Sequence, residues 1–248
     1  MKIPKPWQKD GNLFRNRISV FDGEQHMTKI KICGIKKKEE IEMLNRAKVD
    51  YAGFVFYEKS KRYIEPEIAS EIAKGLSKNI KKVAVTVSPD ANLAKKAEDL
   101  GFDILQVHKE LKKEVLESTG IPIWRAVNIS DIEEYEKEVL KIDNLPYDLR
   151  NRIEAIVVDA PSYGSGRPFN WKRSRRLKKA GTTSPPDGKS DYRFVLAGGL
   201  SAGNVAEGMD FFKPDIVDVS SSVEGDNGKE EDKINVFVSE VRKHDCMA

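Results

Sequence analysis

The 248-residue sequence has only two cysteines, Cys33 and Cys246. So few cysteines argue against the disulfide framework of a small secreted protein and favour a reducing compartment, so we expect free thiols. Long apolar runs are missing as well, and the first residues lack the apolar stretch of a signal peptide. These absences predict a cytoplasmic protein with no membrane partner.

Histidine is scarce too, with three residues scattered along the chain at His26, His108 and His244. No group of side chains has the spacing of metal ligands, so we predict a reaction without a metal ion or other cofactor. An excess of one charge is also missing, since 43 basic residues face 40 acidic ones. This balance gives no electrostatic reason to bind nucleic acid, and we interpret the basic run 172–179 as a solvated helix face.

The residues that are present fit a single domain with a short extension. A 39% hydrophobic share lies well above the range of disordered chains, and roughly 250 residues is the usual length of a (βα)₈ barrel. Residues 1–27 contain prolines and Asp-Gly pairs without sustained periodicity. We interpret them as an N-terminal extension or leader outside the barrel, or else as a cap over one barrel end, and expect the barrel in 28–248.

Eight β-rich runs alternate with amphipathic helical stretches in that part of the chain. Their Val, Ile and Phe content is typical of parallel strands buried on both faces. Eight strand–helix pairs predict right-handed crossovers that close an α/β TIM barrel of eight parallel strands. The predicted strands are 29–34, 51–56, 81–87, 104–108, 123–129, 155–159, 192–197 and 216–220.

Local signals mark some of the connections. The stretch 92–100 has one apolar face and is followed by Gly101, a typical residue after a helix end. Ser130 followed by Glu133 is a capping box that predicts the start of the fifth helix. The loop 181–190 precedes the seventh strand, so we expect it at the barrel end that is remote from the chemistry.

Catalytic groups of this fold lie where strands end and the following loops begin. Few reactive side chains occupy such positions, and they define the candidate site. They are Cys33, Arg62, Gln106, His108, Asp159 and Asp218.

Two turns late in the chain have the composition of a phosphate site. Gly198-Gly199 follows the seventh strand, and Ser220-Ser221 follows the eighth. Loops at these positions direct backbone N–H groups and a helix N-terminus at one point, which suits a phosphate. The glycine pair alone fits a tight turn equally well, but the two turns together favour a phosphorylated ligand.

Cys33 and Asp159 are the candidate base and acid. An ordinary thiol, with a pKa near 8.5, is only about 3% ionised at pH 7, and an ordinary Asp is about one part in a thousand protonated. The site must therefore shift at least one pKa, and a nearby cation would lower that of the thiol. An inert buried cysteine and a helix N-cap are the plain structural alternatives.

Six motifs follow one another over nearly all of 29–224. They are KIKICGI (29–35), GFVFYEKSKRYI (53–64), LQVH (105–108), VVDAPSYGSGRPFNW (157–171), LAGGL (196–200) and VDVSSSVE (217–224). In sequence and order they resemble those of a known family, the phosphoribosylanthranilate isomerases of tryptophan biosynthesis. The resemblance implies an Amadori rearrangement of N-(5-phosphoribosyl)anthranilate to 1-(2-carboxyphenylamino)-1-deoxyribulose 5-phosphate.

The resemblance implies a role for each candidate residue. Cys33 matches the general base, Asp159 the general acid, and Arg62 the arginine that faces the anthranilate carboxylate, a group that a guanidinium binds well. The remaining candidates match binding positions. Gln106, His108 and Asp218 match substrate contacts, and Gly198, Gly199, Ser220 and Ser221 match phosphate contacts.

Three departures from the family pattern are visible, at Lys109, Asn170 and Ser222. The family commonly has glycine where Ser222 stands, so the φ angle at this position is in question, because glycine alone readily adopts a positive φ. None of the three removes a catalytic group. The sequence leaves open whether the protein is a monomer or a homodimer.

Two other functions compete with this interpretation. The related phosphoribosyl-amine isomerase of histidine biosynthesis runs similar chemistry, but it resembles a two-carboxylate site, against which Cys33 and Arg62 argue. A catalytically silent barrel that only binds a phosphorylated ligand is the second alternative, because a fold alone never proves activity.

Overall fold

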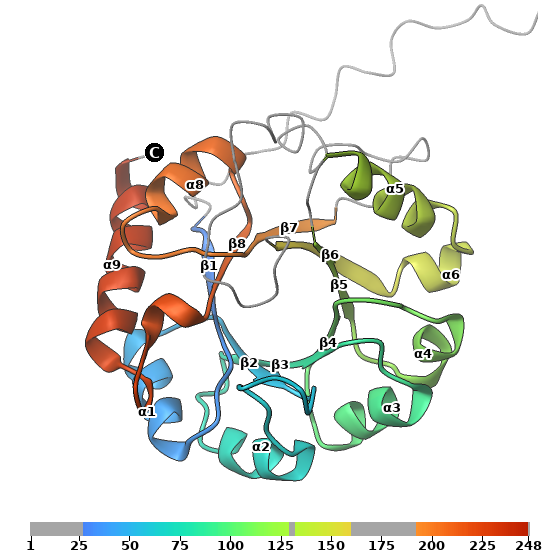
Figure 1. The fold of residues 1–248 in the computed structure, drawn as a ribbon, viewed down its shortest axis with the longest axis horizontal. Helices are drawn as coiled ribbons and strands as arrows, with labels where there is room; N and C mark the ends of the chain where they lie inside the picture. Colours follow the sequence, from blue (N-terminus) through green and yellow to red (C-terminus); the bar gives the residue numbers. More distant parts are fainter. Residues whose placement is uncertain (1–26, 129–131, 160–191, 248) are drawn as a thin grey trace, which may run out of the picture.

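The computed structural model describes residues 27–128, 132–159 and 192–247, and in them eight parallel strands close a barrel in chain order, with β1 beside β8 (Figure 1). The predicted TIM barrel is therefore confirmed. The strands are β1 (Lys29–Cys33), β2 (Tyr51–Val55), β3 (Lys81–Thr86), β4 (Ile104–Val107), β5 (Ile123–Asn128), β6 (Ile153–Asp159), β7 (Arg193–Leu196) and β8 (Ile216–Val219).

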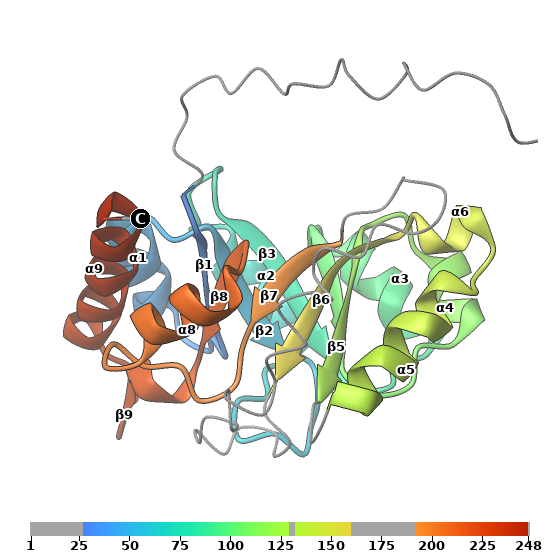
Figure 2. The same ribbon diagram turned by 90° about the horizontal axis from the view of Figure 1, so that it is seen from above.

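Helices surround the strands as an outer ring (Figures 1 and 2). They are α1 (Lys38–Ala47), α2 (Pro66–Ala73), α3 (Ala91–Asp99), α4 (Lys113–Ser118), α5 (Ile132–Asp143), α6 (Tyr147–Arg150), α8 (Val205–Phe212) and α9 (Glu231–Met247). A 3₁₀ turn η2 (Ser221–Val223) and a small antiparallel hairpin, β9 (Glu224–Gly225) and β10 (Gly228–Lys229), connect β8 to α9. No helix in these described ranges is long and apolar enough to cross a membrane.

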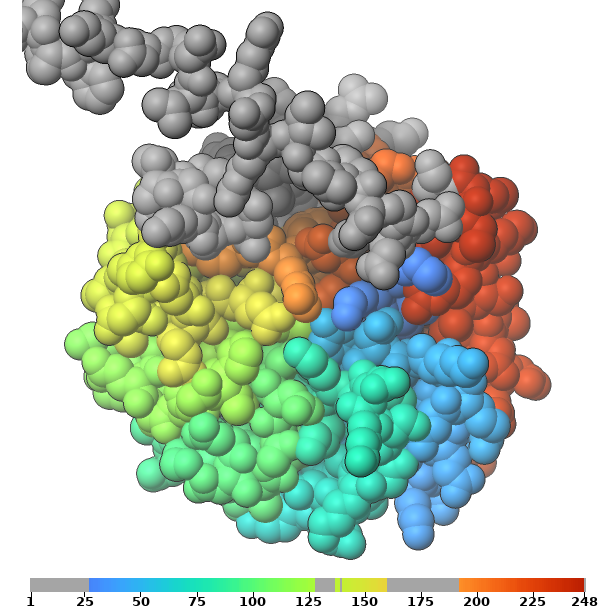
Figure 3. Space-filling model, turned by 180° about the vertical axis from the view of Figure 1, so that it is seen from behind, coloured from blue at the N-terminus to red at the C-terminus, as the bar shows by residue number. Residues whose placement is uncertain are grey.

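The last helix returns to the first strand–helix unit. Figure 3, which shows the barrel from behind, has the blue start of the barrel beside the red α9. Polar contacts hold this junction, since the backbone N–H of Thr28 donates to the Asp245 carboxylate and Arg242 Nη1 donates to the Thr28 carbonyl at 2.6 Å. The ring is thus closed by side chains as well as by the β1–β8 pairing.

Both faces of the strands are buried, as their apolar composition predicts. In β2, Ala52 and Phe54 pack outward among the helices, whereas Tyr51 and Val55 point into the barrel. The barrel interior is a separate apolar cluster in which Trp124 is fully buried. Burial on both faces fixes the register of each strand, because a one-residue slip would exchange the two sets of side chains.

The predicted strands agree with the observed ones except near their ends. Most predicted strands run one residue too far, as at Gly34, because the apolar pattern continues after the chain has left the sheet. Asp90 caps α3 by accepting a hydrogen bond from the Leu93 N–H at 2.7 Å, and Gly101, with a φ of 79°, follows the end of this helix as predicted. Several predictions lie outside the described residues: those for 1–26, the capping residue Ser130, Asn170, the basic run 172–179 and the loop 181–190.

Candidate functional site

A cavity of about 420 Å³ opens at the carboxyl ends of the strands. It is the place where the sequence predicts the chemistry. All ten candidate residues line this one cavity: Cys33, Arg62, Gln106, His108, Asp159, Gly198, Gly199, Asp218, Ser220 and Ser221.

Cys33 is the last residue of β1, and its side chain packs against the interior cluster of the barrel. The hydroxyl of Ser220 donates to its carbonyl oxygen at 2.9 Å, which ties the end of β1 to the loop after β8. Gly34 then turns the chain with a φ of 87°, and a Cβ atom there would lie 2.4 Å from the Arg62 side chain. The glycine after the cysteine is therefore needed for both the turn and the approach of Arg62.

An ion pair lies inside the barrel close to Cys33. Lys31 precedes Cys33 by two residues on the same face of β1, and its side chain is fully buried. Its Nζ atom lies 2.6 Å from Oδ2 of Asp218, the residue opposite it on β8. The other carboxylate oxygen of Asp218 is buried without a hydrogen-bond partner among the described residues. The pair thus leaves one acceptor available beside the cavity.

Burial and neighbouring charges have opposite effects on the pKa values of Cys33, Asp218 and Lys31. Burial raises the pKa of the Cys33 thiol, although the cations Lys31, Lys229 and Arg62 pull it down. Burial also raises the pKa of Asp218, against the effect of Lys31. Burial alone would lower the pKa of Lys31, but the neighbouring Asp218 and Cys33 raise it. The predicted cations are present and lower the pKa of the thiol, but burial outweighs them, so the net shift of this pKa is upward.

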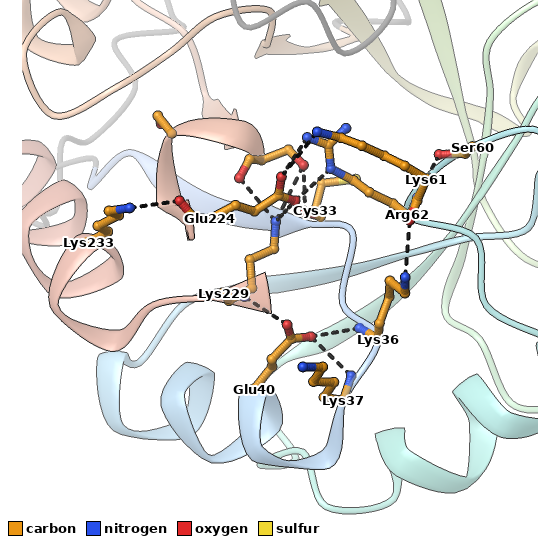
Figure 4. Close-up of polar contacts among 12 residues, drawn as sticks. Cys33, Lys36, Lys37, Glu40, Ser60, Lys61, Arg62, Glu224, Lys229 and Lys233 are labelled. Atoms are coloured by element: carbon orange, nitrogen blue, oxygen red, sulfur yellow. Dashed lines mark hydrogen bonds and ion pairs between the residues drawn. The ribbon is translucent and has the colours of Figure 1, made fainter. Parts of the chain in front are cut away.

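Arg62 reaches the rim of the cavity and binds a carboxylate of the chain itself. Its Nε and Nη2 atoms donate to the two oxygens of Glu224 at 2.6 and 2.8 Å. Lys229, whose side chain is fully buried, approaches Glu224 from another side at 2.8 Å and also donates to the carbonyl of Ser220 at 3.1 Å (Figure 4). Burial alone would raise the pKa of Glu224, but Arg62 and Lys229 lower it to about 2. Arg62 is therefore a working carboxylate clamp in this structure.

The other polar candidates line the cavity from β4 and β6. Asp159 ends β6 and is half-buried. Gln106 is almost fully buried in β4, and its amide nitrogen lies 2.9 Å from Nε2 of His108. The Gln106 side-chain oxygen is buried without a partner in the described ranges. Within these ranges no three His, Cys, Asp or Glu side chains are grouped so that they can hold a metal ion.

The two predicted phosphate turns lie side by side at the cavity. Gly198 and Gly199 have φ angles of 83° and 69°, which only glycine adopts readily. Asn204 holds this turn, since its side chain accepts from the N–H of Ser201 and donates to the carbonyl of Gly199. In the neighbouring turn Ser220 precedes η2, and Ser221 is its first residue.

Ser222 joins these two turns. Its hydroxyl donates to the carbonyl of Leu200 at 2.6 Å. Ser222 is not among the described residues with a positive φ, so the backbone here does not require the glycine that the family commonly has. This departure leaves the turn in an ordinary conformation.

Sequence reasoning missed Lys31, Lys229, Glu224 and the bridging role of Ser222. One signal for Lys31 was available, because a lysine on the inward face of an apolar strand is buried only with a partner. Lys229 and Glu224 had no comparable signal, since they follow β8 in a polar segment whose hairpin brings them to the site.

The comparisons with known proteins agree with this geometry. The family model described as N-(5'phosphoribosyl)anthranilate (PRA) isomerase matches residues 30–240. An N-(5'-phosphoribosyl)anthranilate isomerase of Thermoanaerobacter pseudethanolicus is 37% identical over 219 residues, which are 87% of this chain and 98% of that protein.

Solved structures give the same result. The structure of monomers generated from the dimeric phosphoribosylanthranilate isomerase of Thermotoga maritima has a TM-score of 0.69 at 29% identity, covering 88% of this chain and all of that one. A phosphoribosyl anthranilate isomerase in complex with reduced 1-(o-carboxyphenylamino)-1-deoxyribulose 5-phosphate has a TM-score of 0.70 at 28% identity, with the same coverage. The chain therefore belongs to the N-(5'-phosphoribosyl)anthranilate isomerase family, and the predicted family, barrel fold and isomerase function in tryptophan biosynthesis are confirmed.

Proposed function

We propose that this barrel catalyses the Amadori rearrangement of N-(5-phosphoribosyl)anthranilate with Cys33 as general base and Asp159 as general acid. One observation carries the proposal: a single cavity is lined by this thiol, this carboxyl group, a guanidinium clamp and two phosphate-type turns. The cavity volume of about 420 Å³ lies in the range of pockets that hold small ligands.

The proposed reaction moves two protons. Asp159 donates a proton to the ring oxygen of the sugar, the C1′–O bond breaks, and the anthranilate nitrogen lone pair forms a C1′=N iminium. The thiolate of Cys33 then takes the proton from C2′, and the released electron pair forms a C1′=C2′ bond while the nitrogen recovers its lone pair. The resulting enolamine tautomerises to the ketone. Each assisted proton transfer contributes roughly 10² to 10⁴ in rate.

The remaining residues bind the two ends of the substrate in this proposal. Arg62 exchanges the carboxylate of Glu224 for that of the anthranilate, a planar group of the same kind. Gly198, Gly199, Ser220 and Ser221 hold the phosphate at the two turns that line the cavity after β7 and β8. Gln106, His108 and Asp218 line the same cavity, and the side-chain oxygens of Gln106 and Asp218 that have no partner among the described residues are acceptors for sugar hydroxyls.

The setting of the enzyme is part of the proposal. Both cysteines, Cys33 and Cys246, are free thiols, which supports a reducing cytoplasm. A monomer or homodimer is expected, and the dimeric Thermotoga maritima relative supports the second. We assign residues 28–248 to the catalytic barrel and 1–27 to an extension outside it.

Fluorescence tests the proposal directly. Phosphoribosylanthranilate is generated in a coupled reaction, and its decay is followed with wild type, Cys33→Ser and Asp159→Asn. We expect each variant to lose at least about 10² in rate. Cys246→Ser is the matched control, since this second thiol is exposed on α9 and does not line the cavity, and it should turn over like wild type.

Two outcomes contradict parts of the proposal. If Asp159→Asn is as fast as wild type, the general acid is another group. If wild type binds the reduced product analogue but does not turn over the substrate, the chain is a silent binding barrel.

A further inference from the structure

We propose that Lys31 is a positioning residue for Cys33, and that its ammonium group, shared between Asp218 and the sulfur, is the counter-charge on which the thiolate depends. The proposal deepens the proposed function, because its catalytic meaning rests on Cys33 being the base. Its structural content, a coupling between Lys31 and the thiol, stands on geometry that is independent of the reaction.

The geometry brings the lysine and the sulfur together inside the barrel. Both side chains point inward from β1, and both border the empty side of Gly53 on β2. A Cβ atom at position 53 would lie 2.9 Å from Cys33 Sγ and 3.2 Å from Lys31 Cε. The ammonium end of Lys31 is fully buried and continues to Asp218 at 2.6 Å. The glycine on β2 thus leaves room for the lysine stem beneath the thiol.

Among the described residues, three cations and the two carboxylates bound to them surround the Cys33 thiol. The cations that act on Cys33 are Lys31 from β1, Lys229 from β10 and Arg62 from the loop after β2. The carboxylates bound to them are Asp218 from β8 and Glu224 from β9. Three positive groups therefore face two negative ones, and a thiolate completes the balance. His108 and Asp159 line the same cavity from β4 and β6.

Lys31 is the cation placed for this task. Lys229 and Arg62 share the single carboxylate of Glu224, at 2.8 and 2.6 Å. Lys31 pairs with Asp218 at 2.6 Å and also interacts with Cys33, and of the three cations it acts most strongly on the thiol. A buried ion pair adds little net stability compared with apolar residues of similar size. A buried lysine directly under a reactive thiol therefore needs a reason other than stability, and control of the thiolate supplies it.

Alkylation by iodoacetamide measures this coupling without using the enzymatic reaction. The reagent reacts with the thiolate, so the pH midpoint of the alkylation rate reports the pKa of the thiol. Cys246→Ser is the background, so that only Cys33 reacts. We expect Lys31→Met to raise the midpoint by about 1 to 3 pH units, the effect of removing an adjacent opposite charge. Lys29→Met, the same substitution two residues earlier at an exposed position, should leave it unchanged.

Asp218→Asn gives a prediction of opposite sign. Without its carboxylate partner, the Lys31 ammonium has only the sulfur as an anion, so the alkylation midpoint should fall below that of wild type. A purely structural role of the pair would move both variants in the same direction. If Lys31→Met does not fold, Asp218→Asn decides alone, and a midpoint that is unchanged or higher overturns the proposal.

The same variants separate this proposal from the proposed function. Opposite shifts in alkylation support the coupling even if Cys33→Ser retains turnover, in which case the assignment of the base fails and the coupling stands. Equal midpoints in Lys31→Met and wild type overturn the coupling even if Cys33→Ser is inactive.

Discussion

Replacing Gly53 with alanine should destabilise the barrel at the point where the site is built. The added Cβ atom would lie 2.9 Å from Cys33 Sγ, 3.2 Å from Lys31 Cε and 3.1 Å from the Cα atom of Cys33. The last contact is with backbone, so no side-chain rotation relieves it. The strands β1 and β2, which pair Cys33 with Gly53, must therefore move apart.

The size of the effect follows from these contacts. Overpacking of this kind destabilises by about 1 to 3 kcal/mol, and alanine offsets about 0.4 to 1 kcal/mol of this by restricting the unfolded chain. The net loss of about 1 to 2 kcal/mol corresponds to a fall in Tm of about 2 to 8 °C in a domain of this size.

Thermal and urea unfolding of Gly53→Ala measure this loss. Gly203→Ala is the matched control, because a Cβ atom there meets only the Ser201 hydroxyl at 3.9 Å, an ordinary contact. Equal stability of the two variants would refute the argument that the empty side of Gly53 is filled by the thiol and the lysine stem.

Three further predictions concern the charged and polar contacts around the cavity. The pKa of Glu224 is lowered to about 2 in the folded protein, below its usual 4.5, so its ion pairs stabilise the fold above pH 4.5 and lose this effect as the pH falls toward 2. In wild type the urea midpoint of unfolding should therefore fall between pH 4.5 and 2, and this fall should be smaller in Glu224→Gln. An equal fall in both proteins contradicts the role given to the Glu224 ion pairs. Lys31→Met should lower the free energy of unfolding by about 3 to 5 kcal/mol, because it leaves the buried carboxylate of Asp218 without its partner. In a double-mutant cycle, adding Asp218→Asn should recover part of this loss. If the losses of the two single variants simply add, the pair is not coupled. Ser222→Ala should lose about 0.5 to 1.5 kcal/mol in denaturant unfolding, because the Leu200 carbonyl loses its donor, and full stability would mean that this bridge contributes nothing.

Much of the fold could be predicted because strands and helices are determined largely by the spacing and type of residues close together in the sequence. The β-rich runs and their repeat length predict eight strands, and the barrel follows from how right-handed crossovers close. Strand ends are less well predicted, as at Gly34, because the chain leaves the sheet where its backbone partner ends and not where the apolar pattern ends. The position of Cys33 at a strand end was predictable for the same local reason.

The charges that act on Cys33 could not be predicted in the same way. Lys229 and Glu224 reach the site through a two-strand hairpin that has no apolar pattern, and their partner Arg62 is far away in sequence. The direction of the thiol pKa depends on how far burial outweighs three cations, which only the packed structure determines. The roles assigned to Cys33 and Asp159 stay predictions until the variants are measured.

The contacts between β1 and β8 have a consequence for biosynthesis. Lys31 and Asp218 are 187 residues apart in sequence, and so are Cys33 and Ser220, whose hydroxyl holds the cysteine carbonyl. On the ribosome the thiol emerges early, whereas Asp218, Ser220 and Lys229 emerge only with the final strand and the hairpin after it. A nascent or C-terminally truncated chain therefore carries an ordinary, unorganised cysteine, and its reactivity toward alkylating agents is set only when the last quarter of the polypeptide docks.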